Sequence, residues 1–185
     1  MSVRVCVFCG SRSGVDPAFR ELSRSVGREI ARRGGRIVYG GGSVGLMGEL
    51  AEAARAEGGQ VVGYIPERLQ QREVAKHDLD ALHVTPTMFE RKQRMIEDAD
   101  GFLALPGGLG TLDEVLDAVT LRQLGYHDRP IVLLDQAGFW QPWVAFVRHF
   151  VEHGFADPSV HRLFALRPDI ATALDALGLP DKIVR

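Results

Sequence analysis

Residues 106–114 read Pro-Gly-Gly-Leu-Gly-Thr-Leu-Asp-Glu, a glycine-rich stretch between two apolar segments of different periodicity. Residues 101–105 before it form an apolar run of strand length, and residues 112–124 after it repeat apolar side chains at helical spacing. The stretch is therefore predicted to be a strand-to-helix turn. Its glycines let a ligand approach the backbone amides, and the first turn of the helix presents unpaired N–H groups and the positive end of the helix dipole. This combination is typical of a phosphate site.

Three side chains of this turn indicate a role in ligand binding or catalysis rather than helix stabilisation alone. Thr111 can cap the predicted helix or give its hydroxyl to the same ligand, and Asp113 and Glu114 are expected to place two carboxylates in the first helical turn. An acid in that position stabilises a helix by about 0.3 to 1 kcal/mol, and one acid is enough for that purpose. Two acids beside a triple-glycine turn therefore favour a chemical role for Glu114.

Short apolar strands alternate with helices along the whole chain. The strands are expected at 3–9, 36–39, 61–65, 82–85, 101–105, 131–134 and 163–166. The helices are expected at 17–33, 86–98, 112–124, 139–153 and 168–177, with another that opens at the turn 40–45 and runs to 57. This alternation predicts an α/β fold: a Rossmann-like doubly wound parallel sheet with helices on both faces, in a single domain over residues 1–185. The polar stretch 67–80 is expected to be a long loop.

Composition excludes several classes of protein. The 185 residues suit one domain, with 45% hydrophobic and 25% charged residues. A net charge of -2 gives no reason to expect nucleic acid or an acidic membrane as partner. No apolar run approaches membrane length, and the first residues lead directly into a strand, so we expect a cytoplasmic protein. Cys6 and Cys9 are spaced like a redox pair or half a zinc site, but Cys6 lies inside a predicted strand and no second cysteine pair follows, which favours packing roles.

Three turns of small residues follow strands of the predicted sheet. They contain Ser11 after the first strand, residues 40–42 after the second and residues 107–111 after the fifth. In doubly wound sheets, ligands bind beyond the carboxyl ends of the strands, where the winding reverses. We therefore expect the three turns to converge on one crevice.

Two further motifs are weaker signals. Residues 40–45 match the dinucleotide fingerprint G-x-G-x-x-G, but no acid for a ribose follows the next strand before Glu67, which favours a mononucleotide phosphate over NAD. His149 to His153 match H-x-x-E-H, but a third metal ligand is missing, and histidines near a helix C-terminus are already favoured by the dipole. We interpret both histidines as structural.

Two patterns concern helix surfaces. Arg91 and Lys92 lie near the start of a predicted helix, where cations oppose the dipole, so the pair is predicted to serve an anion or a carboxylate partner. Aromatic residues recur at helical spacing from Phe139 to Phe150. Such a stripe forms either a buried core face or an oligomer interface, and the sequence leaves both alternatives open.

With these residues assembled, the chain resembles the Lonely Guy family, the cytokinin riboside 5′-monophosphate phosphoribohydrolases that were long labelled lysine decarboxylases. The resemblance covers nearly the whole chain. It is carried by Cys9-Gly10-Ser11, by Tyr39-Gly40-Gly41-Gly42, by Met88 with Glu90-Arg91-Lys92, and by Pro106-Gly107-Gly108-Leu109-Gly110-Thr111 with Glu114. It implies that Arg91 and Glu114 are the catalytic pair, that the protein is a homodimer, and that it uses no metal and no cofactor.

The resemblance and the small-residue turns together define a predicted substrate site. Its residues are Ser11, Gly41, Gly42, Glu73, Met88, Lys92, Gly107, Gly108, Leu109, Gly110, Thr111, Leu112, Asp113 and Thr120. Phe89 stands where the family commonly has His, and Leu121 where it often has Trp. Because both positions are expected near the base, plain adenine and an isoprenoid-substituted adenine both remain candidates.

The expected reaction is cleavage of the bond between ribose and base in a purine riboside 5′-monophosphate, which releases free base and ribose 5-phosphate. Loss of the base builds positive charge on the sugar, so a carboxylate such as Glu114 can stabilise the transition state and activate water. Arg91 is expected to hold the ligand or Glu114 in register. No lysine stands in a recognisable pyridoxal phosphate setting, so the decarboxylase label finds no support. A protein of the same fold that binds or senses nucleotides without turnover is the alternative.

Overall fold

The computed structural model describes residues 2–70 and 79–181. Its strands are β1 (Arg4–Phe8), β2 (Arg36–Tyr39), β3 (Gln60–Pro66), β4 (Ala81–Thr85), β5 (Gly101–Ala104), β6 (Ile131–Leu134) and β7 (Ala165–Arg167). Its α-helices are α1 (Ala18–Arg32), α2 (Gly45–Ala56), α3 (Glu67–Gln70), α4 (Met88–Glu97), α5 (Leu109–Gln123), α6 (Gln141–Glu152) and α7 (Ile170–Ala176). Two short 3-10 helices are η1 (Gln136–Gly138) and η2 (Pro158–Arg162).

The described strands form one parallel sheet in the order β4-β3-β2-β1-β5-β6-β7. The order runs outward from β1 in one direction and from β5 in the other, so the winding reverses between these two strands. The predicted doubly wound parallel sheet is confirmed. In this architecture the crevice outside the carboxyl ends of β1 and β5 is the expected place for a ligand.

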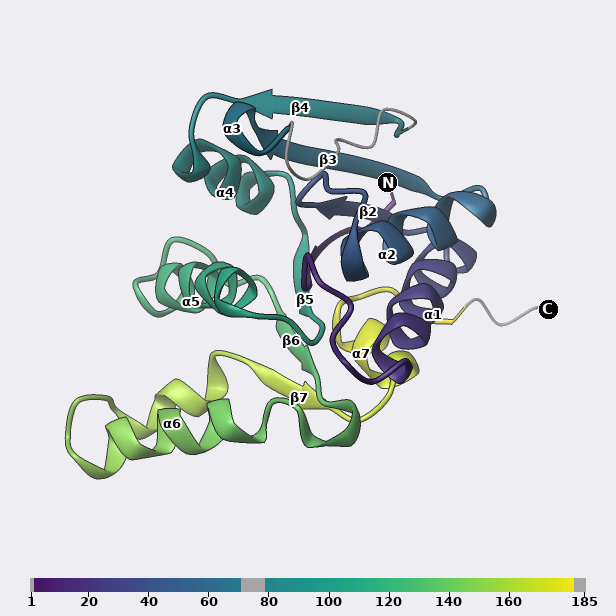
Figure 1. Cartoon of the computed structure of the whole chain (residues 1–185). Helices are drawn as coiled ribbons and strands as arrows, with labels where there is room; N and C mark the ends of the chain where they lie inside the picture. The colour runs from purple at the N-terminus through teal and green to yellow at the C-terminus, as the bar shows by residue number, and fades with distance from the viewer. Residues whose placement is uncertain (1, 71–78, 182–185) are drawn as a thin grey trace.

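Helices cover both faces of the sheet (Figure 1). Helices α1, α2 and α7 lie on one face, and α4, α5 and α6 on the other. Side chains of β1 alternate between the two sides: Val5 and Val7 belong to the core beneath α1 and α2, whereas Cys6 and Phe8 belong to the core beneath α4, α5 and α6. Burial on both faces explains why the central strands are apolar throughout rather than alternating.

The two cysteines lie on opposite sides of the sheet. Both are free thiols, Cys6 in one core cluster and Cys9 in the other. Burial raises the pKa of both thiols above the ordinary value, so they stay protonated and unreactive. Their predicted packing role is confirmed.

Helix α5 begins three residues earlier than predicted, at Leu109 rather than Leu112. Gly108 precedes it as the N-cap in an extended conformation (φ -100°, ψ -154°), and its carbonyl accepts a hydrogen bond from Leu112 N at 3.0 Å. Thr111 therefore lies inside the helix and does not cap it. Asp113 and Glu114 lie in the second turn, so their predicted placement in the first turn was wrong. Stabilisation by the helix dipole falls off within the first turn and does not account for these two acids.

Helix α4 begins at Met88 rather than at Pro86, because Thr87 caps it. The Thr87 hydroxyl accepts a hydrogen bond from Glu90 N at 3.1 Å and satisfies one of the unpaired amides of the first turn. The predicted loop 67–80 opens with the short helix α3, and residues 71–78 lie outside the described residues. The other predicted elements differ from the observed ones only at their ends.

Candidate active site

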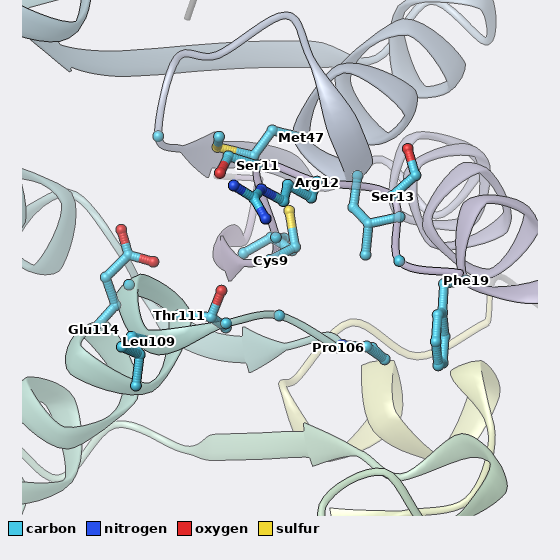
Figure 2. Close-up of a pocket in the computed structure, with 18 of the residues that line it drawn as sticks. Cys9, Ser11, Arg12, Ser13, Phe19, Met47, Pro106, Leu109, Thr111 and Glu114 are labelled. Carbon is cyan, nitrogen blue, oxygen red and sulfur yellow. The ribbon is translucent and has the colours of Figure 1, made fainter. Parts of the chain in front are cut away.

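A pocket of about 630 Å³ lies at the predicted crevice, between the loops that follow β1 and β5. The β1 loop contributes residues 9–14, and the β5 loop with the first turn of α5 contributes residues 106–111. Gly40, Met47, Arg91 and Glu114 complete one part of the wall, and two aromatic residues, Phe19 and Phe139, complete another. Figure 2 shows Glu114 and Phe19 at opposite ends of this pocket.

Hydrogen bonds join the loops that form the pocket. Gly10 N donates to Pro106 O at 3.2 Å, which links the β1 loop to the β5 loop. Leu46 N, in the first turn of α2, donates to Gly10 O at 3.0 Å. Three segments far apart in the sequence are therefore held together at the carboxyl edge of the sheet. The first and third of the predicted small-residue turns converge as expected, and the second contributes Gly40.

The β5 loop leaves its backbone accessible from the pocket. Gly108 and Gly110 line the pocket, and a Cβ atom built on either glycine would meet no heavy atom within 4 Å. Helix α5 starts directly after Gly108 without a side-chain cap, so the amides of its first turn have no intrahelical acceptor. This wall of the pocket therefore combines open space with N–H groups at the positive end of a 15-residue helix.

Arg91 and Glu114 form a buried ion pair in the pocket. Arg91 Nη1 lies 3.1 Å from Glu114 Oε1, and each side chain is only 9% exposed. Arg91 Nε donates to Tyr64 O at 2.9 Å, and Nη1 also contacts Met88 Sδ at 3.3 Å. A Cβ atom on Gly40 would overlap the Arg91 guanidinium, so a larger residue there would displace the arginine from its present position. The arginine is thus held from several directions, and its charge is directed at one carboxylate.

Lys92 forms a second bridge between the same two helices. Its Nζ lies 2.9 Å from Asp113 Oδ2 and 2.7 Å from Asp117 Oδ2, and Lys92 is 9% exposed. Burial lowers the pKa of Lys92, but hydrogen bonds and charge from the two carboxylates outweigh it and raise the pKa above its ordinary value. The predicted carboxylate partners of the basic pair are confirmed. Lys92 does not belong to the described lining of the pocket, so its contacts fit a residue that holds α4 against α5.

We expect Lys92→Met to lower kcat more than it raises KM, because Arg91 and Glu114 sit on the two helices that Lys92 joins. Losing the bridge should reduce stability by roughly 1 to 2 kcal/mol, since Asp113 and Asp117 are partly solvated. A small shift of the Arg91–Glu114 ion pair should cost about tenfold or more in rate if the pair acts on the substrate. Steady-state kinetics measure the change in rate, and thermal unfolding measures the change in stability.

Two variants serve as controls. Lys92→Arg should recover most of the rate. Arg94→Gln, which removes a surface ion pair with Glu90 on α4, is the matched control. A rise in KM alone would instead support substrate contact by Lys92.

The other predicted site residues fall into three groups. Those that line the pocket are Ser11, Met88, Gly107, Gly108, Leu109, Gly110 and Thr111. Those described but absent from the lining are Gly41, Gly42, Lys92, Leu112, Asp113 and Thr120. Gly41 and Gly42 are buried, and Thr120 is exposed on α5. Glu73 lies outside the described residues.

Several lining residues were not among the residues of the predicted substrate site. Arg12 neighbours the predicted Ser11, and Gly40 neighbours the predicted Gly41 and Gly42. Phe19 and Phe139 come from α1 and from the segment before α6, and their rings meet edge to face at 5.8 Å. A small-residue turn indicates where a pocket is, but it does not reveal which neighbouring side chains point inward.

The weaker motifs have ordinary structural settings. The His149 and His153 rings lie 4.1 Å apart at the end of α6, and within residues 2–70 and 79–181 no group of three or more potential metal ligands occurs. The aromatic stripe divides: Trp143 is buried, Phe146 is 52% exposed, and Phe139 lines the pocket. It is therefore neither a uniform core face nor a uniform surface.

Comparisons with known proteins agree on one family. Residues 47–177 match a family described as "Possible lysine decarboxylase". A protein of Oryza sativa subsp. japonica named a probable cytokinin riboside 5′-monophosphate phosphoribohydrolase is 44% identical over 174 residues, covering 94% of this chain and 77% of that protein. A Rhodococcoides fascians protein named cytokinin riboside 5′-monophosphate phosphoribohydrolase is 42% identical over 177 residues, covering 95% and 89%.

The fold is also similar to that of solved structures with other roles. The molybdenum cofactor binding protein from Rippkaea orientalis superimposes with a TM-score of 0.74 over 96% of both chains. Its sequence identity is 20%, so the similarity concerns the fold alone.

Proposed function

The chain belongs to the Lonely Guy family of cytokinin riboside 5′-monophosphate phosphoribohydrolases, and we propose from this that it hydrolyses the N-glycosidic bond of a purine riboside 5′-monophosphate. The products are free base and ribose 5-phosphate. The observation that carries the proposal is the buried Arg91–Glu114 pair beside the open glycine turn of α5. The backbone amides of the turn can bind a phosphate, and the carboxylate of the pair can stabilise positive charge on the sugar that carries this phosphate.

The reaction requires stabilisation of positive charge on the sugar. As the bond from C1′ to the base nitrogen breaks, its electron pair leaves with the base, and C1′ becomes electron-poor. The Glu114 carboxylate stabilises this charge and accepts a proton from the attacking water, whose oxygen bonds to C1′. The departing base gains one proton overall, so water is divided between the two products. Arg91 orients Glu114 through the buried ion pair, in which each side chain is 9% exposed.

The base is tested by comparing two substrates. Purified protein is incubated with AMP and with an adenylate that carries an isoprenoid group on the exocyclic nitrogen, and free base is quantified by chromatography. We propose that at least one is cleaved, with the preference reporting on the residues around the base. Binding of both nucleotides without release of base would contradict hydrolysis and favour a nucleotide sensor of the same fold.

We further propose a homodimer, supported by exposed apolar side chains on the two helices that carry the catalytic pair. Phe89 on α4 is 80% exposed, and on α5 Leu109 is 86% and Leu116 is 40% exposed. Leu124 and Tyr126, directly after α5, are 66% and 76% exposed. Such an apolar surface on adjacent helices is typical of an interaction site.

Leu124→Glu is expected to shift the protein from a dimer toward a monomer, because a charge inside an apolar interface must be desolvated without a partner. Light scattering after gel filtration measures the mass, and the wild type should weigh twice the 20.3 kDa of one chain. Phe155→Glu is the matched control, since Phe155 is 87% exposed but lies after α6. A wild-type protein with the mass of one chain would contradict the proposed dimer.

The remaining parts of the proposal concern location and partners. No helix within the described residues is long and apolar enough to cross a membrane. We further propose a cytoplasmic location, with which the two free cysteines are compatible. A net charge of -2 gives no reason to expect nucleic acid as partner, and we propose a small-molecule nucleotide instead. We treat residues 1–185 as one hydrolase domain.

A further inference from the structure

The loop after β1 has its backbone fixed by its neighbours. Besides the hydrogen bonds of Gly10 to Pro106 and Leu46, the first residue of α2 packs directly on the loop. Gly45 has a φ of +62°, and a Cβ atom there would overlap the backbone of Ser11 and Arg12. The position of the Arg12 backbone is therefore set by protein contacts and needs no ligand to form.

The Arg12 side chain has no protein partner in the described part of the chain. It lines the pocket, and it takes part in no hydrogen bond or ion pair among the described residues. Arg12 is exposed, and Figure 2 shows its guanidinium extending from the β1 loop toward the side of the pocket on which Glu114 lies. Arg91, the other arginine of the pocket, is by contrast paired with Glu114. An unpaired guanidinium presents a planar set of donors that suits two oxygens of one phosphate.

Arg12 also decides the charge of the pocket. The charged side chains in the described lining are Arg12, Arg91 and Glu114, and the last two neutralise each other. Without Arg12 the described side chains that line the pocket would carry no net charge. A phosphate monoester carries nearly two negative charges at neutral pH, and its transfer from water into uncharged surroundings is unfavourable.

The surroundings of Arg12 offer further donors for an anion. The hydroxyl-bearing residues Ser11 and Ser13 lie on either side of it in the lining of the pocket. The β5 loop, bonded to the same β1 loop, brings the open glycines 108 and 110 and the first turn of α5. A cation, hydroxyl groups and backbone amides are the groups that most often bind phosphate in proteins.

We propose that Arg12 binds the 5′-phosphate of the substrate and makes the enzyme selective for nucleotides over nucleosides. The inference rests on the proposed function for the identity of the phosphate ester, but the anion site itself would bind any small sugar phosphate. Arg12 is therefore a specificity-determining residue that binds the phosphate. The Arg91–Glu114 pair instead promotes cleavage of the N-glycosidic bond.

The test uses ribose 5-phosphate as probe, because it carries the phosphate and needs no turnover. Titration calorimetry should show that Arg12→Gln weakens its binding by about 10- to 100-fold, the loss expected for a charge-assisted hydrogen bond. Arg12→Lys should retain part of the affinity, because the charge stays and the planar fork is lost. In kinetic assays Arg12→Gln should raise KM for the nucleotide far more than KM for the corresponding nucleoside.

Arg20→Gln is the matched control, because Arg20 is an exposed arginine of α1 outside the pocket lining. It should bind ribose 5-phosphate like the wild type. Equal affinity of Arg12→Gln and wild type, or no binding of ribose 5-phosphate by the wild type, would overturn the proposal. Arg12-dependent binding without any release of base would leave this proposal standing and refute the hydrolase. Turnover that is insensitive to Arg12→Gln would refute the phosphate role of Arg12 and leave the hydrolase standing.

Discussion

Glu114→Gln should lower the rate of base release by about a hundredfold or more while nucleotide binding stays close to that of the wild type. The amide has nearly the shape of the carboxylate, and its oxygen can still accept a hydrogen bond from Arg91. It carries no charge, so it neither stabilises an electron-poor sugar nor takes a proton from water. Single-turnover kinetics measure the chemical step, and titration calorimetry measures binding.

Glu90→Gln provides the control for Glu114→Gln, since it makes the same chemical change on α4, where Glu90 pairs with Arg94 at the helix surface. This variant should retain the wild-type rate. Thermal unfolding of both variants is needed as well, because Arg91 is 9% exposed and loses its ionic partner in Glu114→Gln. A folded Glu114→Gln protein with a near wild-type rate would remove Glu114 from the mechanism.

The nucleoside that corresponds to the best nucleotide substrate should have a kcat/KM lower by at least about a thousandfold. Charge-assisted hydrogen bonds contribute roughly 1.5 to 3 kcal/mol each, and two or three of them are lost with the phosphate. Part of the loss should appear in kcat, because binding energy from the phosphate helps to position the reacting sugar. Comparable values for nucleoside and nucleotide would mean that the glycine turns serve only the fold.

Gly108→Val tests whether the β5 turn makes the phosphate contact. Gly108 has a φ of -100°, which other residues adopt, and a Cβ atom there meets no heavy atom within 4 Å, so the variant should fold. The branched side chain would occupy room beside the turn and keep a phosphate from the amides. The monophosphate should therefore lose far more rate than the nucleoside. Equal losses for both substrates would place the phosphate elsewhere.

The fold was predictable because the evidence for it is local. Apolar strands that alternate with helices specify a parallel sheet with two covered faces, and each predicted strand is present. The start of α5 was missed because Leu-Gly-Thr offers little helix propensity or periodicity before Leu112. Gly108 in an extended conformation nevertheless starts the helix at Leu109. This error moved Asp113 and Glu114 into the wrong turn.

The candidate site was harder to predict from the sequence than the fold, because its contacts join residues that are far apart in the chain. Nothing in the local pattern shows that α4 and α5 lie side by side, so the pairing of Arg91 with Glu114 came from a family resemblance. The sequence predicted an anion or a carboxylate partner for Lys92, but it did not show that the partners are two carboxylates of α5. Gly40, rather than Gly41 or Gly42, lines the pocket because the Arg91 guanidinium lies against it, and this depends on the packing of α4 against β3.

Product analysis in water labelled with oxygen-18 tests the central claim most directly. Hydrolysis of the N-glycosidic bond should release unlabelled base and ribose 5-phosphate in equal amounts, with one labelled oxygen at C1 of the sugar in freshly formed product. Mass spectrometry at early times detects all three features in one sample. Appearance of nucleoside with labelled inorganic phosphate, or recovery of intact nucleotide after prolonged incubation with folded protein, would contradict the account.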